Sequence, residues 1–443
     1  MSNQHPPHSG KFTTSAGFIL AAVGSAVGMG NLWLFPYRMV QCGGGAFLLP
    51  YFLFIALFSY VGLSGEFALG RLTGAGTMGS FDYALKRRGR RGGKVIGVLP
   101  LLGVLGIAIG YSVVVGWVLR YTAGAFTGSI LTTESQTFFD AIAVSFGSIP
   151  WHAAAIAVTV LILVLGVTSG IEKISKFMMP AFFILFVVIA VRVGFLPGAA
   201  EGYRYLLLPD WSRLADPMTW IYAMGQAFFS LSINGAGMLI YGSYMKKSEN
   251  IVRQSVMTAL LDTVAALLAA FAIIPAVFSF GIPMDAARGP SLLFVTLPKV
   301  FALMPGGRLL AIIFFVSVLF AGITSLMNML EAVGAALSAN SRLSRALSTV
   351  VTGAVTFAAA VWLEALPDMG GWMDLITIYV APFGAVLGAV FIYWVLGMGP
   401  IGDELRLGRE RPVGRAFGFI GKYIYVPLSA IVVLFGILYG GIG

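Results

Sequence analysis

A glycine-rich stretch, Gly24–Asn31, lies inside an apolar run that extends from about Gly17 to Val40. Its order, Gly-Ser-Ala-Val-Gly-Met-Gly-Asn, is a poor composition for a continuous helix. In a bilayer a broken helix is tolerated only where the freed backbone groups face protein or a water-filled cavity. Free carbonyl oxygens there bind cations, and free amides bind anionic groups. The stretch therefore indicates an ion or substrate site, although Gly24 and Gly28 also fit close helix packing through a GxxxG pair.

A second interruption, Ser-Leu-Ser-Ile-Asn-Gly-Ala-Gly, occupies residues 230–237. It falls in the sixth apolar run, five spans after the first, and an odd offset gives the two halves of the chain opposite orientations. Broken helices at matching positions of two inverted halves are typical of secondary transporters that bind their substrate at the middle of the membrane. The positive ends of the half-helices then attract an anionic substrate group, and the unwound carbonyls bind cations.

The composition indicates a membrane protein. Of 443 residues, 58% are hydrophobic and 10% are charged, whereas soluble domains carry about 25% charged residues. The net charge of +10 comes from short basic loops, a pattern that sets membrane orientation and does not indicate nucleic-acid binding. The single cysteine, Cys42, excludes an internal disulfide. The histidines His5, His8 and His152 lack metal-ligand spacing, so we expect neither a transition metal nor an organic cofactor.

About eleven apolar runs reach the roughly 20 residues that a spanning helix needs. We expect an all-α membrane protein with spans at 13–38, 45–71, 94–122, 152–169, 174–195, 218–244, 252–280, 308–338, 345–364, 371–398 and 418–440. Basic loops follow the even-numbered spans, which predicts a cytoplasmic N-terminus and an outer C-terminus. The piece Ser291–Leu303 is too short to span and is expected as a helix over the outer vestibule.

The domain organisation follows from these spans. It comprises a cytoplasmic tail (1–11), a core (12–398) made of a first repeat (12–196) and an inverted second repeat (218–398), a cytoplasmic loop (399–417) and an eleventh helix (418–443).

Long, ordered motifs across residues 12–398 resemble the neurotransmitter:sodium symporter family, and its bacterial branch in particular. They are Gly24–Tyr37, Gly43–Phe47 with Pro50-Tyr51, Glu66–Arg71, Tyr111 with Trp117, Gly225–Ser232 and Phe320–Ser325. The resemblance implies the leucine-transporter-like fold, with two inverted five-helix repeats whose first and sixth helices are broken. It implies sodium-coupled uptake by alternating access, with one or two sodium ions, in a bacterial or archaeal inner membrane.

The resemblance implies two sodium sites, of which the second is intact. Its ligands map onto backbone carbonyls of Gly24, Val27 and Ala321 and hydroxyl groups of Thr324 and Ser325. Five oxygens without a carboxylate suit a monovalent cation rather than calcium or magnesium. The alternative for the two hydroxyl groups is bonding to a carbonyl within their own helix.

The first sodium site departs from the family. Its ligands map onto Ala26, Asn31, Ser230 and Asp262, and the last position is usually Asn. A buried mid-membrane carboxylate is costly unless a cation partners it. Chloride-dependent members hold an anion beside this site, at positions that map onto Tyr51, Gln226, Ser230 and Ala266. Ala266 offers no ligand, so Asp262 is expected to supply the negative charge and make transport chloride-independent.

The substrate-binding positions implied by the resemblance are Ser25, Gly28, Met29, Gly30, Ile107, Tyr111, Phe229, Ser232, Asn234, Gly235, Ser325 and Met329. The amides of Met29 and Gly30 and the Tyr111 hydroxyl would bind a carboxylate. Gly28 stands where monoamine carriers have Asp, which favours a small amino acid or amino-acid-like substrate, with β-amino acids and taurine-like compounds as alternatives. Gly235 stands where the leucine transporter has Phe and predicts a larger pocket.

The gates are altered. Tyr111 and Phe229 resemble the outer aromatic lid, but the outer Arg position is Leu34. Arg38, one turn further out, is expected either to pair with Asp374 or to snorkel to the membrane surface. The inner charged pair maps near Ser9 and Ala339, which are uncharged, and Lys11 has no evident partner.

Two further residues are expected to be structural. Glu66 would accept hydrogen bonds from backbone freed at the second break, and Gln226 lies beside the first sodium site. Another in-span acid, Glu331, is expected to attract sodium near the cytoplasm or to pair with a loop Arg.

Other functions fit less well. A channel needs continuous pore-lining helices or rings of like charge, and an enzyme needs a nucleophile–base or metal constellation, neither of which the sequence contains. A non-transporting substrate sensor on the same fold remains an alternative because both gate pairs are altered. The expected partners are a small-molecule substrate and membrane lipid, with the chain acting as a monomer or homodimer.

Overall fold

The computed structural model describes residues 10–282, 289–366 and 369–440. Within these residues the regular elements are helices, joined by one isolated β-bridge between Gly44 and Pro209. Most of the expected N-terminal tail, with His5, His8 and Ser9, lies outside the described residues, as do residues 441–443 of the expected eleventh helix. The all-helical prediction therefore holds throughout the described chain.

Membrane-length helices dominate this part of the structure. Eight of the described helices are long and apolar enough to span: Gly45–Thr73 (α3 with α4), Gly93–Thr127 (α6 with α7), Val167–Gly194 (containing α11), Ile251–Ser279 (α15), Gly307–Asn340 (α18), Arg345–Glu364 (α19), Met369–Leu396 (α20 with α21) and Arg415–Tyr439 (α23 with α24). A bent pair makes a ninth. The shorter helix α10, Ile149–Val164, adds a tenth. The second broken helix, made of α13 (Pro217–Ser230) and α14 (Gly237–Ser243), adds the eleventh, so the described spans match the eleven expected from the sequence.

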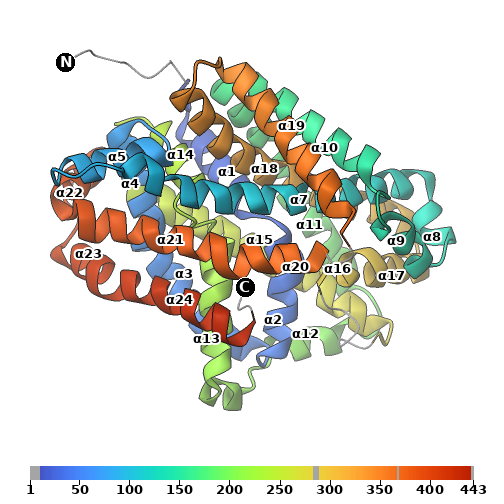
Figure 1. The fold of residues 1–443 in the computed structure, drawn as a ribbon. Helices are drawn as coiled ribbons and strands as arrows, with labels where there is room; N and C mark the ends of the chain where they lie inside the picture. Colours follow the sequence, from blue (N-terminus) through green and yellow to red (C-terminus); the bar gives the residue numbers. More distant parts are fainter. Residues whose placement is uncertain (1–9, 283–288, 367–368, 441–443) are drawn as a thin grey trace.

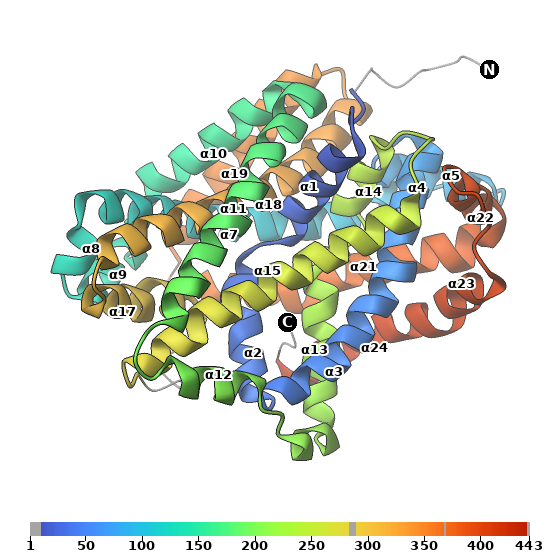
Figure 2. The ribbon, with the colours of Figure 1, turned by 180° about the vertical axis from the view of Figure 1, so that it is seen from behind.

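Both predicted breaks are present. The first span consists of α1 (Ser15–Ala26) and a second part, Gly30–Gln41, that contains α2 (Phe35–Gln41) and is bent by 62° from α1. The sixth span consists of α13 (Pro217–Ser230) and α14 (Gly237–Ser243). In Figures 1 and 2, α1 and α14 share the upper half of the molecule, and α2 and α13 share the lower half. The two breaks therefore meet near mid-height, with opposite chain directions.

Side-chain caps define where several helices begin. The Thr14 hydroxyl accepts a hydrogen bond from the amide of Gly17 (3.0 Å) and starts α1. Asp216 caps α13, whose first residue is Pro217. Asn250 caps α15. These side chains satisfy amide groups that the first turn of a helix leaves without a partner, so the half-helices begin at defined positions.

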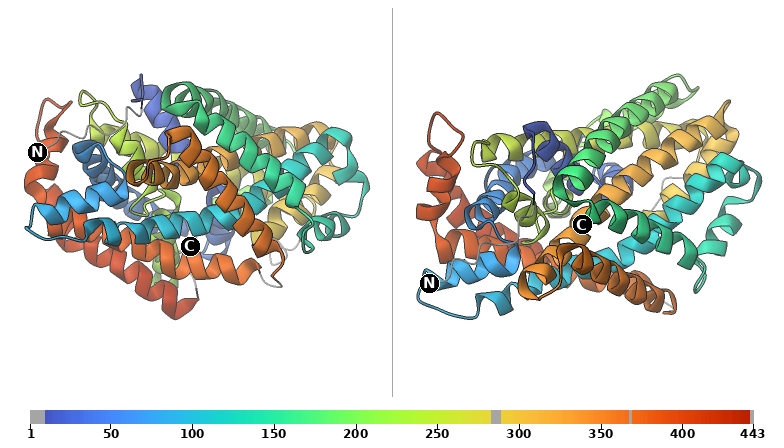
Figure 3. Two further views of the ribbon diagram at one scale, coloured as in Figure 1. Left: turned by 45° about the horizontal axis from the view of Figure 1, so that its top comes forward. Right: turned by 90° about the horizontal axis from the view of Figure 1, so that it is seen from above.

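Shorter helices close the two faces and ends of the bundle. They are α5 (Thr77–Lys86), α8 (Ser129–Thr132), α9 (Ser135–Ala143), α12 (Ala199–Leu207), α16 (Gly289–Ser291), α17 (Leu297–Leu303) and α22 (Met398–Arg406). Figure 3 shows α8 and α9 (teal) at one end of the molecule and α22 and α23 (red) at the other. The expected short helix at 291–303 is present in a continuous helix Gly289–Leu303, whereas residues 283–288 of that connection lie outside the described part.

Two expectations about connections were wrong. The fourth span was expected to run to 169, but α10 ends at Val164 and the next helix begins at Val167. Gly166 has a φ of +89°, a conformation that glycine adopts without strain, and it ends the span there. Consequently Glu172, which falls between the expected spans 152–169 and 174–195, lies within the fifth span. The expected loop 399–417 likewise contains α22 and the start of α23.

Candidate functional site

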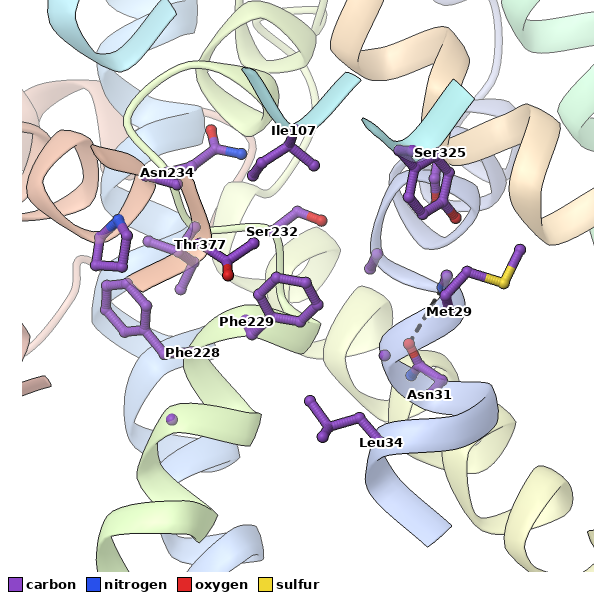
Figure 4. A pocket seen from close by; sticks show the side chains of 18 of the residues that line it. Met29, Asn31, Leu34, Ile107, Phe228, Phe229, Ser232, Asn234, Ser325 and Thr377 are labelled. Atoms are coloured by element: carbon purple, nitrogen blue, oxygen red, sulfur yellow. Dashed lines mark hydrogen bonds between the residues drawn. The ribbon is translucent and has the colours of Figure 1, made fainter. Parts of the chain in front are cut away.

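A cavity of about 250 Å³ lies between the two breaks. Eleven of the twelve predicted substrate positions line it: Ser25, Gly28, Met29, Gly30, Ile107, Tyr111, Phe229, Ser232, Asn234, Ser325 and Met329. Figure 4 shows the cavity with residues from both breaks facing it. The sequence missed a further wall, Met373, Thr377, Ala381 and Pro382 from the tenth span, because that helix has neither a break nor a polar pattern that would single out these positions.

Gly235 is the exception, and its predicted role was wrong. It does not line the cavity, and a Cβ there would lie 2.6 Å from the carbonyl oxygen of Gly384 in α21. Its φ is +75°, which favours glycine. The amide of Gly235 donates a hydrogen bond to Glu66 Oε1 (2.8 Å). Gly235 therefore lets the unwound segment pack against α21, while the buried Glu66 receives an amide freed at the break.

The five residues predicted to form the second sodium site come together between α1 and α18. Ser325 Oγ lies 3.1 Å from the carbonyl oxygen of Gly24 and 2.9 Å from that of Val27. Thr324 Oγ1 lies 3.1 Å from the carbonyl oxygen of Ala321. The alternative role, a hydroxyl bonded to a carbonyl of its own helix, is also present, because Thr324 donates to the carbonyl of Phe320 (2.9 Å) one turn earlier. That bond uses the hydroxyl hydrogen and leaves oxygen lone pairs available.

This cluster contains more acceptor oxygens than hydroxyl hydrogens that could bond to them. One hydroxyl of Ser325 faces the carbonyl oxygens of Gly24, Ser25 and Val27 within 3.3 Å, yet it can donate a single hydrogen. All these residues are buried. Several neutral oxygens converging on one buried point form the donor set of a hard monovalent cation, and the absence of a carboxylate makes a divalent ion a poor fit.

A buried carboxylate lies at the centre of the predicted first sodium site. Asp262 Oδ1 accepts from Asn31 Nδ2 (2.8 Å), and Asp262 Oδ2 accepts from the Ser230 hydroxyl (2.5 Å). Asn31 Oδ1 accepts from the amide of Gly28 (3.2 Å), which ties this cluster to the first break. The three side chains are almost completely buried, so Asp262 is supported by two donors but faces no cationic side chain in these contacts.

The predicted chloride positions include Ser230, which donates to this carboxylate. Tyr51, Gln226 and Ala266 are each fully buried. Gln226 Nε2 donates to the carbonyl of Gly30 (3.4 Å), while its Oε1 has no hydrogen-bond partner in the described chain. Ala266, one helical turn from Asp262 on α15, brings a methyl group to this region. The only formal negative charge among these residues is that of Asp262.

The carboxylate-binding end of the cavity has an open donor. The Tyr111 hydroxyl is buried and lacks a hydrogen-bond partner among the residues described. A Cβ on Gly28 would lie 3.1 Å from that hydroxyl, so a longer side chain at this position would fill the space beside it. A Cβ on Gly30 would lie 2.8 Å from the Phe229 ring. Small residues at the break therefore keep the start of the second half-helix accessible to an anionic group.

The predicted outer ion pair is not formed in this structure. Arg38 Nη1 donates to Gln41 (2.8 Å), and the Arg38 guanidinium lies 3.8 Å from the ring centroid of Tyr222. Asp374 is exposed, and the ion pairs found in the described residues do not join it to Arg38. The cation–π contact with Tyr222 takes the place of the carboxylate partner.

On the predicted cytoplasmic side, a carboxylate that the sequence analysis missed holds the start of α1. Glu172 accepts hydrogen bonds from the amide (2.6 Å) and hydroxyl (2.7 Å) of Thr13 and from the amide (3.2 Å) and hydroxyl (2.8 Å) of Thr14. Lys176 pairs with Glu172 (2.6 Å), and Lys246 donates to the carbonyl of Thr13 (2.6 Å). The segment before α1 is therefore bonded both to the fifth span and to the loop that follows the sixth span.

Glu331 lies nearby and shows which of its two expected roles the structure supports. It forms an ion pair with Arg345 (2.9 Å) and accepts from the Tyr244 hydroxyl (2.5 Å). The Tyr244 carbonyl in turn accepts from the amide of Phe12 (3.2 Å), whose ring is buried against neighbouring aromatic rings. Lys11, considered a substitute for the missing inner charge, has no side-chain ion pair in the described structure.

We expect Glu172→Gln to loosen the start of α1. The change removes the negative charge that strengthens four hydrogen bonds and the ion pair with Lys176. Amide hydrogen exchange of the peptide that covers residues 11–18 should accelerate about tenfold or more, equivalent to about 1.4 kcal/mol. The matched control is Asp82→Asn, which removes a carboxylate from the partly exposed ion pair with Lys86 and should leave that peptide unchanged. Equal exchange in Glu172→Gln and wild type would contradict this role.

Taken together, two antiparallel broken helices, a buried cavity between them and oxygen clusters at both breaks define a helical membrane transporter. A model of the sodium:neurotransmitter symporter family matches residues 9–141 and 139–440. An uncharacterized sodium-dependent transporter of Bacillus subtilis is 34% identical over 458 residues, which cover 99% of each chain. One of Methanocaldococcus jannaschii is 30% identical over 447 residues, covering 95% of this chain and 88% of the relative. The chain belongs to the sodium:neurotransmitter symporter family.

A solved structure gives the same result for the fold. The crystal structure of MhsT in complex with L-phenylalanine matches with a TM-score of 0.85 and 30% sequence identity, and the match covers 96% of this chain and 99% of that chain. The expected fold, with two inverted five-helix repeats and broken first and sixth helices, is thereby confirmed. The protein is an integral membrane, sodium-dependent transporter of a small molecule and not an enzyme.

Proposed function

We propose that the protein is a symporter that couples the inward movement of one or two sodium ions to the uptake of a small amino acid or a similar compound. The observation that carries the proposal is the crowding of the Gly24 and Val27 carbonyls around Ser325, directly beside the open Tyr111 hydroxyl. Sodium at those oxygens would fix the first break in the shape that presents amides and Tyr111 to a carboxylate. Ion and substrate binding would thus reinforce each other.

Two further features support an amino acid. The chain is similar along its whole length to MhsT, whose structure contains L-phenylalanine. Residue 28 is a glycine and not an aspartate. It therefore offers no side-chain carboxylate that could bind the amine of a substrate lacking a carboxylate of its own. A β-amino acid or a taurine-like compound also carries an anionic group and an amine, and these are the alternative substrates.

The basic loops support a cytoplasmic N-terminus and an outer C-terminus, and the bacterial and archaeal relatives support the inner membrane of such a cell as the location. The cavity and both ion clusters are built by a single chain, so a monomer suffices, and a homodimer would consist of two independent units in lipid. Asp262 would replace chloride as the counter-charge, which makes uptake chloride-independent.

The proposal is tested with the purified chain in sealed vesicles. An inward sodium gradient should drive accumulation of a labelled amino acid above its external concentration, and dissipating the gradient with a sodium ionophore should abolish accumulation. A screen of neutral amino acids, β-amino acids and taurine identifies the substrate class. Sodium-dependent binding without accumulation would instead assign the chain to the sensor alternative.

A further inference from the structure

Asn234 lies in the second break and has its amide group held in one orientation. Its Oδ1 accepts hydrogen bonds from the amides of Ala236 (3.0 Å) and Gly237 (2.8 Å), at the start of α14. Backbone amides can only donate, so the side-chain atom that they contact must be the oxygen. The Asn234 NH₂ group is therefore the remaining end of the side chain, and its position is fixed by the start of the helix.

That NH₂ group faces the cavity. Asn234 is one of the cavity-lining residues, and Figure 4 shows its nitrogen directed toward Ile107. No carbonyl or carboxylate of the described residues accepts a hydrogen bond from Asn234 Nδ2. The side chain is partly buried, and the nitrogen remains accessible from the cavity. The break thus presents a free donor to whatever occupies the cavity.

Unlike the Tyr111 hydroxyl at the other end, several side-chain hydroxyl groups that line the same cavity already have hydrogen-bond partners. Ser232 donates to the carbonyl of Ser25 (3.0 Å), and Thr377 donates to the carbonyl of Met373 (2.8 Å). Ser325 faces the carbonyl oxygens of the sodium cluster. In contrast to these groups, the Asn234 amide has donor capacity to spare.

The Asn234 NH₂ group lies at a different end of the cavity from the predicted carboxylate-binding groups. In Figure 4, Asn234 and Ile107 lie together on one side of the cavity, and Met29 and Asn31 lie on the other side. The neighbouring side chain of Ile107 is apolar. A bound substrate that displaces water from this end without offering an acceptor leaves the NH₂ group unsatisfied, which costs free energy.

We infer that Asn234 selects substrates whose side chain carries a hydrogen-bond-accepting oxygen at the end remote from the carboxylate. This inference rests on the proposed function, and it narrows the substrate class to amino acids with an apolar stem and an oxygen-bearing end. A site that hydrogen-bonds a substrate oxygen disfavours the analogue that lacks it, because its own polar group is then left unpaired.

The test compares pairs of amino acids that have similar shapes but differ in the oxygen. Sodium-dependent binding to the purified full chain is measured for threonine against valine, asparagine against leucine, and tyrosine against phenylalanine. Wild type should favour the oxygen-bearing member of at least one pair by about two- to tenfold, the range that one neutral hydrogen bond supplies. Each affinity ratio is taken within a pair, so effects common to both members cancel.

Asn234→Asp isolates the donor. It keeps an oxygen that can accept from the amides of Ala236 and Gly237, so α14 retains its start, but it puts an oxygen where the NH₂ group was. The favourable ratio should disappear or reverse. Asn234→Ser, which also lacks the NH₂ group, should likewise lose the preference for the oxygen-bearing amino acid. Thr356→Ala is the matched control, because the buried Thr356 hydroxyl donates to the carbonyl of Thr352 within α19, outside the cavity, and its removal should leave the affinity ratio unchanged.

The outcomes separate the two proposals. A wild-type preference that survives Asn234→Asp, or the absence of any preference in all three pairs, would overturn the role of Asn234 while leaving sodium-coupled amino-acid binding intact. If none of the amino acids binds in a sodium-dependent way, the proposed function itself fails, and the inference about Asn234 fails with it.

Discussion

Replacing Thr324 with Ala and Ser325 with Val in the same chain should raise the sodium concentration for half-maximal substrate binding about tenfold or more, a loss of at least about 1.4 kcal/mol. The two changes remove both hydroxyl oxygens from the cluster that the carbonyls of Gly24, Val27 and Ala321 complete. Because the remaining carbonyls cannot alone replace the hydration of a sodium ion, the ion binds more weakly. Substrate binding at saturating sodium should recover.

A control is needed because Ser325 also holds the first break against α18. Ser317→Ala removes another buried hydroxyl from α18, one that donates to the carbonyl of Ile313 (2.6 Å) and lies outside the cluster. It should leave the sodium requirement unchanged. If the double variant folds, binds substrate and keeps the wild-type sodium requirement, the oxygen cluster is not a sodium site.

Much of the fold could be predicted because glycine and serine interrupt otherwise membrane-length runs. The Gly24–Asn31 stretch and residues 230–237 are local signals, so both breaks are visible without knowledge of contacts. The same logic failed at Gly166, where one glycine ends the fourth span. A single glycine in an apolar run is ambiguous, because glycine also occurs within spanning helices.

The site was predictable where residue type alone decides chemistry and not where packing does. Asp262 stood out because a carboxylate in an apolar run needs a partner, and the structure shows Asn31 and Ser230 as its donors. Gly235 was misread because its contact with Gly384 depends on how α21 approaches the break. The contacts of Glu172 with Thr13 and Thr14 join segments more than 150 residues apart, and the sequence contains no local sign of them.

The second prediction of large effect concerns the charge beside the first sodium site. Replacing chloride with gluconate should leave wild-type uptake nearly unchanged, because in the proposed mechanism Asp262 supplies the charge that compensates sodium. In a buried, low-dielectric site an uncompensated charge is strongly unfavourable. Asp262→Asn removes that compensation while keeping the size of the side chain and an oxygen, and it should raise the sodium requirement about tenfold or more, equivalent to about 1.4 kcal/mol.

A second substitution should then restore function through an external anion. Ala266 lies one turn from Asp262 on α15, in the region where Tyr51 and Gln226 are also buried. Asp262→Asn combined with Ala266→Ser adds a hydroxyl donor for an anion, so uptake by the double variant should rise with chloride concentration, whereas Ala266→Ser alone should remain insensitive. Uptake by the unmodified protein that falls when chloride is removed would show that Asp262 does not serve as the counter-charge. The double variant distinguishes a missing charge from a damaged site, since chloride can replace the charge but cannot repair misfolding.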